Sequence, residues 1–145
     1  MTDLAPALIP ELSVRDWQRS VAFYRELLGF SVCYLRPEDG FAMLEREGAR
    51  IMLDQIGVGR DFAPLVGAIS GPLGRGVNLQ IPVSLGAPIL AALEAEGWPL
   101  VIDREDRWYR VGDTEVGNRQ FVVADPDGYL LRFYQDLGSR AVKQA

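Results

Sequence analysis

The chain has 145 residues, enough for one domain with a sizeable core, and its 48% hydrophobic and 24% charged residues are typical of a soluble globular protein. Its formal net charge of −5 disfavours nucleic acid as a partner, because that role needs clustered basic residues. The sequence contains no histidine, which removes the commonest transition-metal ligand and the default general base near neutral pH.

Nothing in the sequence points to a membrane or to an oxidising compartment. No apolar run approaches the roughly 20 residues that a membrane span needs. The start of the chain lacks the basic-then-apolar order of a signal peptide. Cys33 is the single cysteine, so an internal disulfide is excluded. These features predict a cytoplasmic protein.

The first half of the chain carries the patterns of a strand, a helix and three more strands. Residues 8–14 alternate as a half-buried strand. Apolar residues then recur at helical spacing over 17–28, with Asp16 as the predicted N-cap and Gly29 as the stop. Short strands are predicted next, over residues 30–35, 41–46 and 50–56.

The second half repeats this order. A strand is predicted over 77–83 and a helix over 87–96, with Pro88 tolerated in its first turn. Asp125-Pro126-Asp127-Gly128 is strong turn chemistry, so residues 118–134 are predicted to form a hairpin. Between the helix and the hairpin lie two strand-like stretches, residues 98–104 and 108–111.

The two halves therefore predict a duplicated unit. Glu11–Val14 aligns with Gln80–Val83, and Gly29-Phe30 aligns with Gly97-Trp98. Six of the fifteen glycines and two prolines fall between the halves, which predicts a linker or mobile flap there. The expected organisation is a single domain, residues 1–138, with modules at about 8–56 and 77–136, a linker over 57–76 and a tail over 139–145.

Strand faces turned away from the helices are rich in polar side chains, with aromatic and thioether groups among them. Such a lining suits a small-molecule site. Trp108 and Tyr109 are adjacent in a strand, so one is expected to pack inward and the other to line the rim of the cleft. The candidate ligand-binding residues are Glu11, Met52, Asp54, Asn78, Gln80, Trp108, Tyr109, Gln120, Arg132 and Tyr134.

Arg132 stands in the middle of the last predicted strand. A buried arginine is costly unless it is paired, so we expect Glu11, Asp54 or an anionic ligand near it. An acidic partner makes Arg132 structural, whereas a carboxylate or phosphate ligand makes it an anchor. No catalytic carboxylate pair stands out; the acidic run Asp103–Asp106 is interpreted as a solvated strand end.

Three segments carry a family resemblance: Ser13–Tyr24, Leu28-Gly29-Phe30 and Asp125–Tyr129. Together they resemble the vicinal oxygen chelate superfamily, which includes glyoxalase I, extradiol dioxygenases, fosfomycin-modifying enzymes and bleomycin resistance proteins. The resemblance covers almost the whole chain. It implies an α+β fold of two βαβββ modules, whose curved mixed sheets enclose clefts and whose helices pack on the outer face, and it implies a homodimer.

Enzymes of that superfamily hold a divalent metal on cleft-facing strand positions, usually with His and Glu. Carried over by motif, these positions are Ile9, Met52, Asn78 and Arg132. Ile9 has no donor atom, Met52 offers a soft thioether, and Arg132 is permanently positive. This departure points to the metal-free branch that resembles bleomycin resistance proteins, acidic dimers that sequester a cationic, aromatic antibiotic.

The sequence thus predicts a metal-independent, homodimeric small-molecule-binding protein with no cofactor and no catalytic residue, and a bleomycin-like antibiotic is the candidate ligand. One alternative is a lyase, isomerase or dioxygenase of the same superfamily, which either holds a metal with atypical ligands such as Glu11, Asp54 and Asn78 or uses Glu11 or Tyr134 as an acid/base without a metal. Another is a structural dimer whose cleft is filled by its own side chains. The identity of the ligand, and whether clefts form within one chain or between two, stay open.

Overall fold

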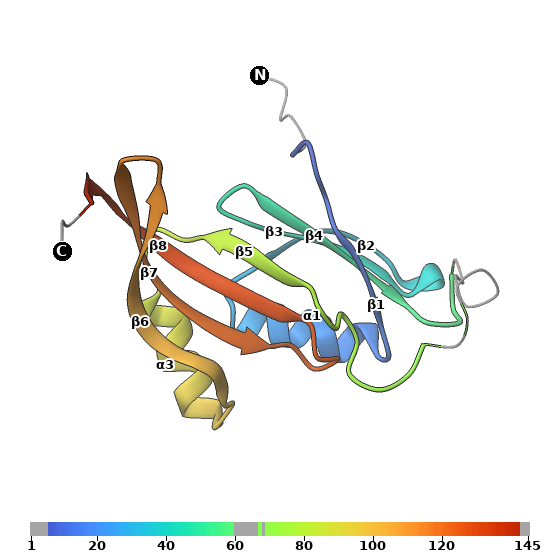
Figure 1. Cartoon of the computed structure of the whole chain (residues 1–145). Coiled ribbons are helices and arrows are strands. Elements are labelled where there is room, and N and C mark those ends of the chain that lie inside the picture. Colours follow the sequence, from blue (N-terminus) through green and yellow to red (C-terminus); the bar gives the residue numbers. More distant parts are fainter. Residues whose placement is uncertain (1–5, 60–66, 68, 143–145) are drawn as a thin grey trace, which may run out of the picture. The chain divides into compact units, whose positions relative to one another are not determined.

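The computed structural model describes residues 6–59, 67 and 69–142 (Figure 1). Its contacts divide the chain into two compact units. The N-terminal unit comprises Met1–Arg75 together with Asp125–Tyr129, and the C-terminal unit comprises Gly76–Ala124 and Leu130–Ala145. The turn of the last hairpin is therefore part of the N-terminal unit, although both strands that it joins belong to the other unit. No helix of the described residues is long and apolar enough to cross a membrane.

The N-terminal unit is built on a four-stranded mixed sheet with the order β1-β4-β3-β2. Strand β1 pairs in parallel with β4, and the other neighbours are antiparallel. The elements, in chain order, are β1 (Glu11–Val14), α1 (Trp17–Glu26), β2 (Ser31–Arg36), the short 3-10 helix η1 (Pro37–Asp39), β3 (Phe41–Arg46) and β4 (Ala49–Gln55).

Helix α1 begins and packs as the sequence predicts. The side chain of Asp16 accepts a hydrogen bond from the backbone N–H of Arg19 at 3.2 Å, which satisfies one of the open donors of the first turn. Tyr24 is fully buried and meets Phe30 edge-on, with ring centroids 5.4 Å apart. Gly29 follows with φ of +76°, a backbone conformation that glycine adopts without strain.

The C-terminal unit repeats the plan with a sheet of order β5-β8-β7-β6. Strand β5 pairs in parallel with β8, while β8 with β7 and β7 with β6 are antiparallel. The elements are β5 (Asn78–Pro82), α3 (Ala87–Glu96), β6 (Leu100–Val111), β7 (Thr114–Ala124) and β8 (Leu130–Ala141). Each unit thus runs strand–helix–strand–strand–strand, which confirms the predicted α+β fold of two βαβββ modules with mixed sheets.

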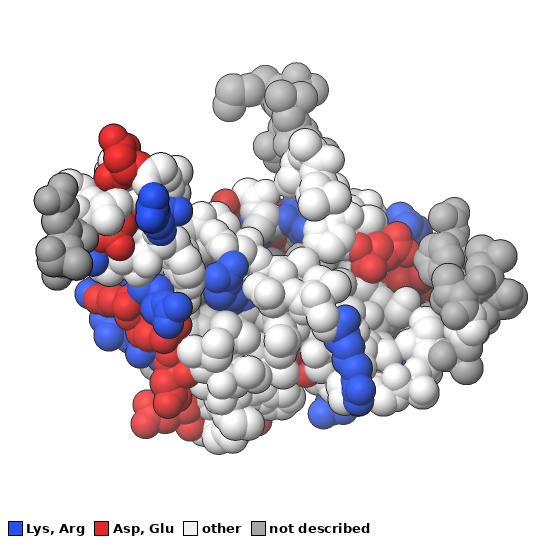
Figure 2. Space-filling model, viewed as in Figure 1, with Lys and Arg blue, Asp and Glu red and all other residues white. Residues whose placement is uncertain are grey.

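Strand β6 differs from the prediction. The two stretches expected at 98–104 and 108–111 form one twelve-residue strand, and two register shifts between Leu100 and Glu105 accommodate the charged run. Asp103–Asp106 therefore lies within a strand and not at a solvated strand end. Because β6 is an edge strand, its charges discourage pairing with a further strand. Figure 2 shows acidic and basic side chains interleaved over this part of the unit.

The ends of the modules also extend beyond their expected limits. Strand β8 continues to Ala141, where it pairs with Thr114, so regular structure reaches into the predicted tail. A register shift between Gly117 and Asn118 keeps the long pairing intact. Of the predicted linker, residues 60–66 and 68 lie outside the described residues, so its role as a mobile flap stays a prediction.

Candidate functional site

The N-terminal sheet carries a pocket of about 270 Å³ on one face. Its position follows from the strand register, in which Glu11 is opposite Met52, Asp54 is opposite Phe41, and Phe41 is opposite Arg36. Residues directly opposite one another project from the same face of a sheet, so four strands contribute to one lining. The pocket is lined by Glu11, Arg36, Asp39, Phe41, Met52 and Asp54.

The lining combines negative charge with an aromatic floor. The lining contains three carboxyl groups and one guanidinium, and Asp54 is only 6% exposed. The guanidinium of Arg36 lies 3.9 Å above the ring of Phe41 and forms an ion pair with Asp39 at 3.4 Å. Counted over the whole lining, three acids and one base give the pocket a net negative charge. An organic cation with an apolar body is the kind of molecule that such a lining favours.

The C-terminal sheet gathers a second set of the predicted residues on one face. The side-chain amide of Gln120 donates from Nε2 to Glu105 Oε1 at 3.1 Å and to the hydroxyl of Tyr109 at 2.7 Å. Arg132 donates from Nη2 to Gln80 Oε1 at 2.6 Å. Tyr134 is directly opposite Gln120 in the pairing of β7 with β8.

Two polar atoms of this face are buried without a hydrogen-bond partner among the described residues. They are Oε1 of Gln120, whose side chain is 3% exposed, and Nε of Arg132. An unsatisfied buried group costs about 1–3 kcal/mol, so such groups are rare in native proteins and call for an explanation. One of these atoms is an acceptor and the other a donor, so a ligand with both functions could satisfy them.

The structure separates the predicted site residues into groups. Glu11, Met52 and Asp54 lie together in the N-terminal pocket. Asn78 is exposed at the first position of β5. Trp108 belongs to another cluster, where its ring lies against Gly117 and 3.8 Å below the guanidinium of Arg140, so Tyr109 is the member of the pair that joins the Gln120 cluster.

Arg132 has Gln80 as its partner within its own unit. Glu11 and Asp54 belong to the other unit, so an ion pair between either of them and Arg132 stays a prediction. An anionic ligand near Arg132 likewise stays a prediction.

Sequence reasoning missed three residues of the N-terminal pocket: Arg36, Asp39 and Phe41. A signal for Phe41 was present, because the Glu47-Gly48 turn fixes the register of the β3–β4 hairpin. Counting back from that turn places Phe41 opposite Asp54. Glu105 was also missed, because it was assigned to the solvated acidic run.

The residues at the superfamily's metal positions do not fit a hard divalent cation. Ile9 precedes β1 and has no donor atom, and Met52 offers a thioether in the N-terminal unit. Asn78 and the positively charged Arg132 stand in the C-terminal unit. Among residues 6–59, 67 and 69–142, no group of three or more His, Cys, Asp or Glu side chains is placed to hold a metal ion.

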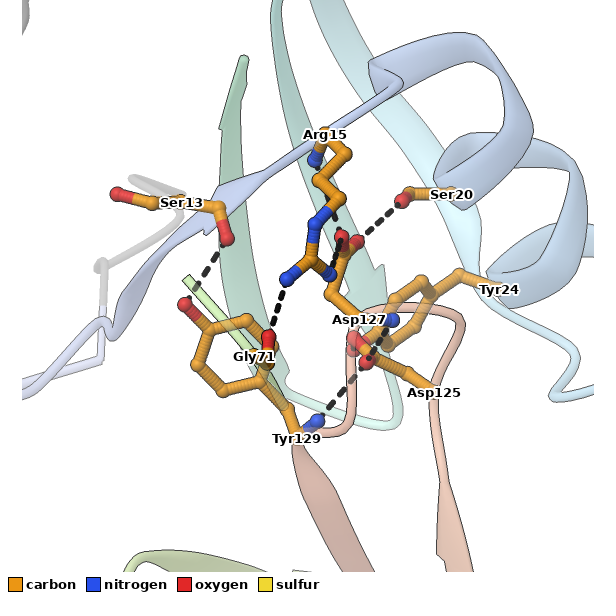
Figure 3. A network of polar contacts seen from close by, with 8 residues as sticks. All are labelled: Ser13, Arg15, Ser20, Tyr24, Gly71, Asp125, Asp127 and Tyr129. Atoms are coloured by element: carbon orange, nitrogen blue, oxygen red, sulfur yellow. Dashed lines mark hydrogen bonds and ion pairs between the residues drawn. The ribbon is translucent and has the colours of Figure 1, made fainter. Parts of the chain in front are cut away.

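The turn of the last hairpin forms a polar network with the N-terminal elements (Figure 3). Asp125 accepts from the backbone N–H groups of Asp127 and Tyr129 through Oδ1, at 2.9 and 3.0 Å, and from the Tyr24 hydroxyl through Oδ2, at 2.8 Å. Burial raises the pKa of the Asp125 carboxyl above its usual value. Burial, followed by the charge of Asp125, also raises the pKa of Tyr24.

Asp127 is the second acid of this network. Its Oδ1 accepts from the backbone N–H of Arg15 at 3.1 Å and from Nη1 of the same residue at 3.2 Å, and its Oδ2 accepts from the Ser20 hydroxyl at 3.3 Å. Arg15 also donates to the carbonyl of Gly71. Both turn carboxylates are fully engaged in holding the turn, so their role is structural.

Tyr129 completes the network from the other end of the turn. Its hydroxyl donates to the carbonyl of Ser13 at 2.9 Å, and burial raises its pKa to about 12. Its ring lies so close to Gly74 that a side chain at that position would collide with it. The turn is therefore held by close packing as well as by hydrogen bonds.

Comparison with known proteins places the chain in a family. Curated bleomycin resistance proteins from Geobacillus stearothermophilus and Staphylococcus aureus are 30% identical to it over an alignment of 150 positions, which covers 90% of this chain and 97% of each relative. The chain belongs to the glyoxalase/bleomycin resistance protein/dioxygenase superfamily, the vicinal oxygen chelate superfamily. No family model matches the chain.

Solved structures share the fold. TioX from Micromonospora sp. ML1 superposes with a TM-score of 0.67 at 23% identity, over 92% of this chain and 100% of that protein. A glyoxalase/bleomycin resistance protein/dioxygenase from Nocardioides gives a TM-score of 0.60 at 20% identity, over 99% and 92% of the two chains. The duplicated βαβββ architecture is common to all of them.

Proposed function

We propose that this protein binds a small organic cation with an aromatic body, that it does so without a metal ion, and that a bleomycin-like antibiotic is the first ligand to test. The N-terminal pocket carries this proposal, because it combines the carboxyl groups of Glu11 and Asp54 with the aromatic floor of Phe41. The names of the curated relatives, bleomycin resistance proteins, suggest the antibiotic.

The physical chemistry of the pocket supports a cationic ligand. A carboxylate that is largely withdrawn from water, as Asp54 is, attracts a positive charge more strongly than a fully hydrated one does. The guanidinium of Arg36 already lies over the ring of Phe41, so this lining holds a cation on its aromatic face, an interaction of about 0.5–2 kcal/mol. The donor set supports metal independence, because the thioether of Met52 and the charge of Arg132 suit organic groups better than a hard cation.

Considered by itself, the C-terminal sheet offers a polar contact to an organic ligand. Gln120 Oε1 offers an unused acceptor, and Arg132 Nε offers an unused donor, among the described residues. An amide or a similar group that both donates and accepts would satisfy both. We include Gln80, Tyr109, Gln120, Arg132 and Tyr134 in the proposed binding residues on this ground.

The proposal extends to assembly and organisation. A homodimer is part of the proposal, because the family resemblance of the chain implies one. The single domain of two modules, the linker over 57–76 and a cytoplasmic location complete the proposal. Sedimentation of the purified protein tests the dimer directly.

A thermal-shift panel of cationic aromatic compounds that includes bleomycin tests the binding function. Ligand that binds only the folded protein raises the unfolding temperature. The expected stabilisation should be lost in the double variant Asp54→Asn, Glu11→Gln and kept in Glu38→Gln, which removes an exposed acid outside the pocket. A flat response to every compound, or equal stabilisation of all three proteins, would contradict the proposal.

A further inference from the structure

A larger hollow lies in the C-terminal unit, between α3 and the sheet. It encloses about 410 Å³, within the range of small-molecule sites. We call it the α3 hollow; its floor and walls include Leu90, Ala91, Phe121, Arg104, Arg119 and Gln135. Phe121 and Gln120 are consecutive in β7, so their side chains project from opposite faces of the sheet. The hollow is therefore separate from the face that carries Gln120 and Arg132.

The hollow exists because α3 presents small side chains above a large apolar floor. Ile89 and Leu93 anchor the helix in the core, while Ala87 and Ala91 leave the space beside Leu90 open. The first turn of the helix approaches the sheet closely at Gly86. A side chain at Gly86 would stand 3.1 Å from the ring of Phe121, so the backbone itself forms this end of the hollow.

Polar groups along the edge of the hollow are held in fixed positions. Arg119 donates to both carboxylate oxygens of Asp106, from Nε at 2.9 Å and from Nη2 at 3.0 Å. This bidentate pair fixes the plane of the guanidinium, and the hydrogen bonds from Arg119 lower the pKa of Asp106. Gln135, opposite Arg119 in the strand pairing, accepts from the backbone N–H of Gly86 at 3.0 Å.

Arg104 is the cation that remains available at the hollow. Its side chain makes no hydrogen bond or ion pair with the described residues, although its charge also acts on Asp106. Arg119 is already engaged by Asp106, and Glu94 is the acid among the lining residues. The first turn of α3 has no side-chain cap, so its backbone N–H groups add to the positive potential at the Gly86 end.

We infer that the α3 hollow is a second ligand site, which takes a small carboxylate with an aromatic or aliphatic body. The body lies on Phe121 beneath Leu90 and Ala91, and the carboxylate meets the guanidinium of Arg104. The site is independent of the cation pocket in the N-terminal unit, so either can exist without the other.

The test is a calorimetric titration of the full chain with 1-naphthoate, with 1-naphthylmethanol as the uncharged analogue and 1-naphthylmethylammonium as the cationic one. The carboxylate should bind at least about tenfold more tightly than either analogue, the effect expected of one charge-assisted hydrogen bond. Arg104→Gln should remove that preference. Arg107→Gln is the matched control, since Arg107 lies in the same strand but outside the hollow. This variant should bind the carboxylate as the wild type does.

A variant whose side chain fills the hollow provides a second, independent test. Ala91→Trp should abolish binding of 1-naphthoate while Asp54→Asn leaves it unchanged, which separates this site from the N-terminal pocket. Amide chemical-shift changes on binding should centre on Ala91 and Phe121, and this mapping stands even if Ala91→Trp fails to fold. Absence of binding, binding unaffected by Arg104→Gln, or shifts centred on Asp54 would each overturn the inference.

Discussion

The turn Asp125–Tyr129 and the strands β7 and β8 beside it both bury polar side chains, yet they differ in how fully those side chains are paired. In the turn, all four carboxylate oxygens of Asp125 and Asp127 accept at least one hydrogen bond. In the strands, Gln120 Oε1 and Arg132 Nε are buried with no partner among the described residues.

The buried polar groups of the two regions therefore have different consequences for the protein. A paired network stabilises the folded chain, because removing one member leaves its partners buried and unsatisfied. Each unpaired buried group lowers stability by about 1–3 kcal/mol and calls for an explanation, such as the ligand proposed here. Substitutions in the turn should therefore change stability, whereas substitutions on the strand face should change ligand binding.

Asp127→Ala should give the largest effect. It removes three hydrogen bonds and leaves Arg15 and Ser20 without their acceptor, so the free energy of unfolding should fall by about 3 kcal/mol, at about 1 kcal/mol for each bond. Urea unfolding measures this change, with Asp113→Ala in an exposed turn as the control. A loss as small as that of the control would mean that the network does not stabilise the fold.

Tyr24→Phe should give the next largest effect on stability. It deletes only the hydroxyl that donates to Asp125 Oδ2, and leaves the ring contacts with Phe23 and Phe30 in place. Hydrogen bonds to charged groups contribute about 1.5–3 kcal/mol, so the free energy of unfolding should fall by that amount. An unchanged urea midpoint would show that water replaces the hydroxyl at no cost.

Asp125 should add a smaller, pH-dependent effect. Because burial raises its pKa, the folded state keeps this proton to a higher pH than the unfolded chain does. Its contribution to stability is therefore present at low pH and lost as the pH rises from the unfolded value through the raised folded value. Asp125→Asn does not titrate, so the wild-type-minus-variant difference in unfolding free energy should fall across that window and then level off. A difference that rises with pH would mean that the folded pKa is lowered.

Arg132→Met should have the smallest effect on stability. It removes a buried donor that has no partner and one hydrogen bond to Gln80, so the two changes should cancel to within about 1 kcal/mol. Affinity for a ligand that contacts this face should nevertheless fall about tenfold or more. Arg132→Lys keeps the charge and serves as the comparison. A large loss of stability with unchanged binding would make Arg132 a structural residue.

The fold was predictable wherever short-range signals were strong. The bounds of β3 and α3 agree with the prediction, because glycine-containing turns and clear periodicity delimit both segments. The continuity of β6 was not predictable, since its charged run interrupts the alternation. What holds that run in a strand is its pairing with β7, including the ion pair of Asp106 with Arg119.

The candidate site was predictable to the extent that alternation sets the faces of strands. It placed Glu11, Met52 and Asp54 on one lining, as the N-terminal pocket has them. It could not reveal Arg15 as the partner of Asp127, because the two are 112 residues apart and Arg15 lies in a loop with no periodic pattern. Pairs of this kind depend on the tertiary fold and leave no local signal.

Calorimetric titration of the metal-stripped protein with bleomycin, repeated after addition of Mn, Ni or Zn ions, tests the central claim most directly. We predict saturable binding that is the same with and without the ions, and no binding of the ions alone. Stoichiometric binding of a metal ion that is lost in Asp54→Ala or Glu11→Ala, or binding of the antibiotic only when a metal ion is present, would contradict a metal-independent function.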